Sequence, residues 1–165
     1  MAVPCLADED DWPVLKGARV ENRPPAVAFA VYRSLSHRST GFGVYRMQRP
    51  EALKPYLLAR RVEAQSGKAE ISWASSETCP QLEPALAELA RLPTPVIAPP
   101  RTSPVDDLKL TLDGSSYFLW ATDARWSAGD SMAGMELRAV DDSPVAAWTE
   151  KTLKSLEPCW GPTRP

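Results

Sequence analysis

The chain has 165 residues, enough for one domain with a sizeable buried core, and its hydrophobic share of 44% and charged share of 24% are those of an ordinary globular protein. Its formal net charge of -2 provides no general basic field, which argues against a nucleic-acid-binding protein. No apolar run approaches the roughly 20 residues that span a membrane.

The first 25 residues predict an N-terminal arm. They contain an acidic run at 8–11 and the proline pairs Trp12-Pro13 and Pro24-Pro25. No basic and apolar leader is visible in them. Four adjacent carboxylates do not easily converge on one ion, so the run indicates a solvated arm and not a metal site. We expect a single domain at 26–160 and a flexible tail at 161–165.

Alternating apolar residues predict a first group of strands at about 26–73. Val27, Phe29 and Val31 alternate with small residues, and a second strand is expected at 41–49 after a polar connection. Residues 56–64 suit a strand or a helix, and we favour a strand because 65–68 predicts a hairpin turn.

A helix is predicted at about 80–92. Thr78 is a suitable N-cap, and Gln81 three residues later completes a capping-box pattern. Pro84 interrupts the pattern, so the regular helix is expected to begin near Glu83. The apolar residues that share one helical face are Leu82, Leu86 and Leu89.

The second half predicts further strands at about 106–140 and a last helix. Asp113-Gly114 is a preferred tight-turn dipeptide, and it indicates a hairpin between 107–112 and 115–122. Another strand is expected at 135–140. Ser143 as N-cap and Pro144 at the first helical position then begin a helix at about 144–157. The expected fold class is α+β, an antiparallel sheet with its two main helices on one face.

Three cysteines leave two interpretations open. Cys79 and Cys159 each lie at the edge of a predicted helix and suit a disulfide that closes a loop of about 80 residues. Alternatively all three, including Cys5, are reduced, as is usual in the cytoplasm. We favour the disulfide, and with it a periplasmic or secreted protein over a cytoplasmic one.

No motif indicates catalysis, a metal or a cofactor. His37 is the single histidine of the chain, and no serine precedes a helix in a nucleophile turn. No Cys-x-x-Cys pair suits zinc. The acidic residues of the second half each have a local explanation as a turn or cap residue, although paired carboxylates that converge only in the fold remain an alternative.

Two groups of residues suit a protein partner. The first is a cluster of six arginines along the predicted first strands and their connections, of which Arg33, Arg46 and Arg60 are our candidates for contact with an acidic partner; the other members are Arg38, Arg49 and Arg61. The second is a polar loop that carries Arg125, Trp126 and Met132, where an exposed tryptophan is typical of interface hot spots.

Together these features predict a non-enzymatic protein-binding module. A concrete form is an inhibitor or immunity-type protein of the bacterial envelope or secreted space, with another protein as its partner and with no nucleic acid, cofactor or metal. The alternatives are a small hydrolase whose carboxylates converge in three dimensions, and a structural subunit of a larger assembly. The oligomeric state does not follow from the sequence.

Overall fold

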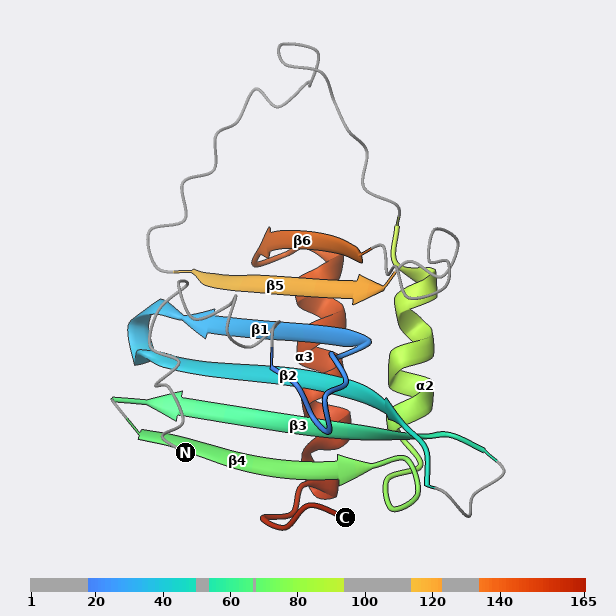
Figure 1. The fold of residues 1–165 in the computed structure, drawn as a ribbon. Coiled ribbons are helices and arrows are strands. Elements are labelled where there is room, and N and C mark those ends of the chain that lie inside the picture. Colours follow the sequence, from blue (N-terminus) through green and yellow to red (C-terminus); the bar gives the residue numbers. More distant parts are fainter. Residues whose placement is uncertain (1–17, 50–53, 67, 94–113, 123–133) are drawn as a thin grey trace.

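The computed structural model describes residues 18–49, 54–66, 68–93, 114–122 and 134–165. Its strands form one antiparallel sheet in the order β4-β3-β2-β1-β5-β6, and both helices lie on the same face of that sheet (Figure 1). This confirms the expected α+β class. The strands are β1 (Val27–Arg33), β2 (Arg38–Met47), β3 (Tyr56–Gln65), β4 (Lys68–Ser75), β5 (Ser115–Thr122) and β6 (Gly134–Val140), and the helices are α2 (Leu82–Ala87) and α3 (Pro144–Leu156).

Strands β1 to β4 form the predicted meander, with tighter turns than the sequence indicated. Arg33 pairs with Arg38, so β2 begins at Arg38 and the polar connection shrinks to a short 3-10 turn closed by His37 in the left-handed region, at φ 46°. The choice of a strand at 56–64 is confirmed. At its end Gln65 pairs with Lys68, and Ser66 takes a positive φ of 49°, as expected for a tight hairpin turn.

Strand β5 joins the two strand groups into one sheet. It pairs with β1 on one side and with β6 on the other, so both of its edges are occupied. Residues 107–112, the predicted hairpin partner of this strand, lie outside the described residues. Of the two pairings that the structure shows, the one with β1 is long-range in the sequence, whereas the one with β6 joins consecutive strands.

The main core lies between the sheet and the helices. Phe29 of β1 stacks on Phe42 of β2 with ring centroids 4.4 Å apart, and the indole of Trp148 on α3 meets Phe29 edge-on at 4.9 Å. All three side chains are buried. Aromatic pairs of this kind add to the free energy gained by burying their area, so they fix α3 across the middle of the sheet.

Helix α2 begins differently from the prediction. Its N-cap is Gln81, whose side chain makes no capping bond, and Thr78 instead turns back on Ser75, whose carbonyl accepts from the backbone of both Thr78 and Cys79. The capping box was therefore wrong. Pro84 is the third helical residue, where an amide has no acceptor within the helix, so it is accommodated without a kink. The α-helix ends at Ala87, and the 3-10 turn Glu88–Arg91 continues it.

Helix α3 begins as predicted. Pro144 is its first residue, and the Ser143 hydroxyl accepts a bond of 3.1 Å from the backbone amide of Ala146. After α3 the 3-10 turn Glu157–Cys159 brings Cys159 to Cys79, which lies just before α2. The two cysteines form a disulfide with 5.5 Å between their Cα atoms, so the predicted bridge is confirmed.

The C-terminal residues lie along β4. Gly161 and Trp73 exchange two backbone hydrogen bonds of 2.8 and 2.9 Å, and Arg164 pairs with Glu21 while its guanidinium lies over the Trp73 ring. The predicted 161–165 tail is therefore in contact with the sheet edge and with the end of the arm. Neither helix of the described part is long and apolar enough to cross a membrane.

Candidate functional site: an arginine pocket beside α3

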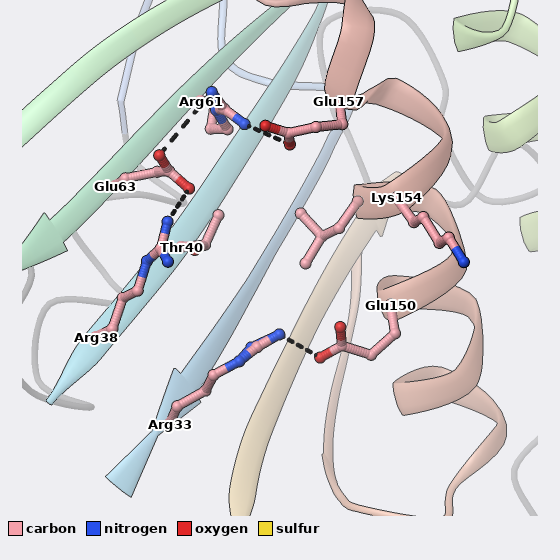
Figure 2. Close-up of a pocket in the computed structure, with 9 residues that line it drawn as sticks. Arg33, Arg38, Thr40, Arg61, Glu63, Glu150, Lys154 and Glu157 are labelled. Carbon is pink, nitrogen blue, oxygen red and sulfur yellow. Dashed lines mark hydrogen bonds and ion pairs between the residues drawn. The ribbon is translucent and has the colours of Figure 1, made fainter. Parts of the chain in front are cut away.

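A pocket of about 280 Å³ lies between the sheet and the C-terminal half of α3 (Figure 2). Strands β1, β2 and β3 form one wall with alternate residues that face the helix layer, and α3 forms the other wall. We call it the arginine pocket. Its residues are Arg33, Arg38, Thr40, Arg61, Glu63, Glu150, Leu153, Lys154 and Glu157.

Arg61 has its guanidinium held in place by two neighbouring side chains. Its Nε donates to the Ser72 hydroxyl at 2.9 Å, and its guanidinium lies over the Trp160 ring, 4.8 Å from the ring centroid. Its side chain is only 12% exposed. These contacts fix the plane of the guanidinium and leave its Nη atoms facing the pocket, which is the arrangement that recognises a carboxylate well.

In the structure Arg61 forms an ion pair with an exposed carboxylate, that of Glu157. Glu157 Oε2 lies 3.0 Å from Arg61 Nη1, yet the Glu157 side chain is 71% exposed. The other carboxylate near Arg61 is Glu63, whose Oε2 is 3.9 Å from Nη2. An ion pair with so exposed a partner contributes little to stability, because solvent screens it and ordering the side chain costs entropy.

Two further ion pairs complete the pocket. Glu63 Oε1 accepts from Arg38 Nη2 at 3.0 Å, so Glu63 lies between Arg38 and Arg61. At the other end Arg33 Nη2 lies 2.6 Å from Glu150 Oε1 and joins β1 to α3. Three arginines thus face three glutamates, and Lys154, which points away from these pairs, gives the pocket lining one excess positive charge (Figure 2).

Tyr117 of β5 extends this network through hydrogen bonds with Glu150 and Asp141. The oxygen of the Tyr117 hydroxyl lies 3.0 Å from Glu150 Oε1 and 3.2 Å from Asp141 Oδ1, so the two carboxylate oxygens share its one proton. Asp141 Oδ2 in turn accepts from the Ser115 amide at 2.8 Å. Burial raises the pKa of Tyr117 to about 12, and the contacts and negative charges of Glu150 and Asp141 act in the same direction. The phenol therefore holds its proton between two carboxylates.

The geometry of this carboxylate pair suits a structural contact better than hydrolysis. Because both oxygens bond to one hydroxyl, Asp141 Oδ1 and Glu150 Oε1 lie within about 6 Å of one another, a spacing found between catalytic carboxylates. In a hydrolase that space must hold a water or the scissile bond. Here the Tyr117 oxygen occupies it.

The three arginines predicted as contact candidates lie at different places on the sheet. Arg33 lines the pocket, whereas Arg46 is exposed near the far end of β2. Arg60 lies on the opposite face of the sheet, beside Tyr45, whose pKa burial raises while Arg60 opposes the rise. Arg125, Trp126 and Met132 lie outside the described residues, so their role as a contact loop stays a prediction.

Sequence reasoning missed the residues that matter most in the pocket. Arg61 and Arg38 belonged to the predicted arginine cluster but were not among the candidates, and Glu150 and Glu157 were not considered. The period of two along a strand was the available signal, because it sends Arg60 and Arg61 to opposite faces. Nothing local in the sequence brings α3 to this wall.

Among the residues that the structure describes, no group of three or more histidine, cysteine, aspartate or glutamate side chains is placed to hold a metal ion. Comparison of the chain with protein-family models, with curated proteins and with solved structures finds no match. The site must therefore be interpreted from its own geometry.

Proposed function

We propose that this protein is a non-enzymatic protein-binding module, of the inhibitor or immunity type, that holds an acidic segment of a partner protein in the arginine pocket. The proposal rests on the ion pair between Arg61 and Glu157, whose two side chains differ strongly in solvent exposure. The Arg61 side chain is 12% exposed and is held by Ser72 and Trp160, whereas that of its partner Glu157 is 71% exposed.

Exchange of carboxylates is the binding step. Glu157 swings into solvent, and an aspartate or glutamate side chain of the partner takes its place on the Arg61 guanidinium. The exchange leaves the net charge of the pocket unchanged, because one carboxylate leaves as another enters. Arg61 is already oriented, so little entropy is lost in ordering it. Glu157 acts as a tethered competitor that lowers the affinity for weak or solitary carboxylates.

The disulfide supports our proposal for the compartment. Cys79 and Cys159 are compatible with an oxidising space, and we place the protein in the bacterial envelope or among secreted proteins. Mass spectrometry of protein alkylated before reduction, taken from its native source, tests this. A bridged Cys79–Cys159 pair is expected, and three free thiols would contradict the assignment.

The carboxylate exchange is tested with an N-acetylated tetraglutamate probe. Its binding is measured by isothermal titration calorimetry in all variants, and in the wild type and Glu157→Ala the NMR resonance of the Arg61 Nε–H group reports whether the probe reaches Arg61. Removal of the internal competitor is expected to strengthen binding about tenfold, and Arg61→Gln is expected to abolish it. Equal affinity in the wild type and in Glu157→Ala would contradict the exchange.

A matched arginine serves as the control. Arg49 also forms an ion pair, with Glu77 at 2.8 Å, and also lies over an aromatic ring, that of Tyr56 at 5.1 Å. Arg49→Gln therefore removes an equivalent set of contacts outside the pocket. In cross-linked capture from the native source, wild type and Arg49→Gln are expected to recover the same acidic partner and Arg61→Gln to lose it. Capture of that partner by Arg61→Gln, or of no partner by any form, would count against the function.

The hydrolase alternative makes a different prediction. If Asp141 and Glu150 are catalytic, Tyr117→Phe opens the space between them and leaves both carboxylates in place. Hydrolysis of a panel of glycoside and ester substrates that depends on Glu150 would favour that function over ours.

A further inference from the structure

Strand β6 is an edge of the sheet (Figure 1). It pairs with β5 on one side, and within the described part of the chain no strand pairs with its other side. The opposite edge, β4, differs, because Gly161 bonds to Trp73 there. An edge strand presents backbone donors and acceptors that template pairing with another strand.

The side chains of β6 divide by face. On the helix side lie the apolar residues Met135, Leu137 and Ala139, of which Leu137 and Ala139 pack against the main core. On the other side lie Glu136, Arg138 and Val140. Met135 is 48% exposed and Val140 is 62% exposed, so both ends of the strand carry apolar surface open to solvent.

We propose that β6 pairs antiparallel with β6 of a second copy of this chain, about a twofold axis at Leu137. In this register Glu136 lies opposite Arg138 of the partner subunit, and Arg138 lies opposite the partner subunit's Glu136. Both pairs lie on the face away from the helices, and opposite charges directly across a strand pair are favourable. The strand is thus complementary to itself, as a twofold interface requires.

The charges select this register over its neighbours. If the axis lay at Glu136, two glutamates would face each other, and if it lay at Arg138, two arginines would do so. A slip of one residue would turn the apolar row of one copy toward the polar row of the other. Only the axis at Leu137 both places opposite charges across the strand pair and keeps the apolar rows of the two copies on the same face.

The helix side of the same register is apolar throughout. Leu137 meets Leu137 of the partner subunit, and Met135 meets the partner subunit's Ala139. This row continues the core that Leu119 and Leu137 already share across β5 and β6. A seven-residue strand pair buries a small area, so the dimer is expected to be weak and to depend on concentration.

In its own strand, Glu136 Oε1 lies 3.7 Å from Arg138 Nε, and the Arg138 guanidinium lies over the Phe118 ring at 5.1 Å. The side chain of Arg138 is 66% exposed. Strand pairing keeps Arg138 on this face, where it can reach the partner carboxylate. None of these residues belongs to the arginine pocket, so the two proposals stand or fall separately.

Sedimentation equilibrium of the full chain over a range of concentrations tests the pairing. The wild type is expected to rise above the 18.1 kDa mass of one chain as concentration increases. Glu136→Arg and Arg138→Glu each place two pairs of like charges across the axis, and each is expected to weaken dimerisation about tenfold or more. Circular dichroism and thermal melting confirm that the variants are folded.

The charge swap makes the test specific to this register. Glu136→Arg combined with Arg138→Glu in one chain restores both opposite pairs and is expected to restore the dimer. An equimolar mixture of the two single variants is expected to form heterodimers, because one copy then carries two arginines and the other two glutamates. A wild type that stays at one chain mass, or single variants that the swap does not rescue, would overturn the proposal.

Discussion

The indole nitrogen of Trp148 on α3 donates a hydrogen bond of 3.0 Å to the carbonyl oxygen of Ala85 on α2. The bond joins the two helices directly, and the same side chain contacts Phe29 of the sheet. A second tryptophan provides the comparison. The indole nitrogen of Trp160 is also buried, but it has no hydrogen-bond partner among the described residues.

Substitution of these two tryptophans should therefore have unequal effects. Trp148→Phe removes the bond to the Ala85 carbonyl, whereas Trp160→Phe removes a buried donor that has no partner among the described residues. We expect Trp148→Phe to lower the free energy of unfolding by about 1–3 kcal/mol more than Trp160→Phe does. Urea denaturation followed by circular dichroism measures both. Equal losses would mean that the indole bond contributes nothing.

The disulfide should contribute a large part of the free energy of unfolding. Replacing Cys79 and Cys159 together by alanine frees a loop of 80 residues, which on the chain-entropy account costs about 4 kcal/mol. The measurement is urea denaturation of the double variant beside the wild type with and without reductant. Reductant is expected to shift the wild type and to leave the variant unchanged. Cys5→Ser serves as the control, and a large loss in that variant would argue against this pairing.

Alkaline pH should destabilise the protein through Tyr117. Its folded pKa is about 12, above the ordinary value of 10.0, so the folded state holds a proton that the unfolded state releases. The free energy of unfolding therefore falls as pH rises from about 10 to about 12, by roughly 2–3 kcal/mol in all.

Removing the phenol isolates this effect. Denaturation curves recorded between about pH 8 and about pH 12 should show a smaller decline for Tyr117→Phe than for the wild type. Tyr56→Phe, on the same sheet but outside the contacts with Glu150 and Asp141, is the matched control and should decline as the wild type does. Parallel declines of Tyr117→Phe and the wild type would contradict the expectation.

Gly43 lies where a side chain has no room. A Cβ atom there would come within 2.8 Å of the Tyr45 hydroxyl oxygen, and Tyr45 is fully buried with its hydroxyl bonded to the Ala18 carbonyl. We expect Gly43→Ala to cost about 1–3 kcal/mol of stability. At Gly161 the nearest atom to an added Cβ is 4.0 Å away. Gly161→Ala should therefore change the thermal midpoint little, and a similar loss at both positions would contradict the packing argument.

The alternation of apolar residues, the turn residues and the helix-capping residues predicted most of the helices and strands. Alternation located β1, the Asp113-Gly114 dipeptide indicated a strand at β5, the hairpin turn after Gln65 favoured a strand at β3, and Ser143 with Pro144 gave the start of α3. These signals are local, and the structure agrees with them. At α2 the local signal misled, because Thr78 suits a cap as well as it suits the turn in which its hydroxyl and amide contact Ser75.

The pocket depended on contacts that no local pattern contains. Arg33 and Glu150 are 117 residues apart, and Arg61 and Glu157 are 96 apart. The sequence showed arginines on strands and glutamates on a helix, but not which strand face meets which turn of the helix. The Tyr117 contacts with Asp141 and Glu150 depend on the order β1-β5-β6, which a simple reading of sequential hairpins does not predict.

The central place of β1 has a consequence for how the chain reaches this fold. Strand β2 becomes available soon after β1 emerges, whereas β5, its other neighbour, ends at Thr122. During synthesis one edge of β1 therefore waits for nearly a hundred residues to follow before its native neighbour exists. Pairing over so long a sequence separation slows folding, and an unpaired strand edge is prone to aggregation.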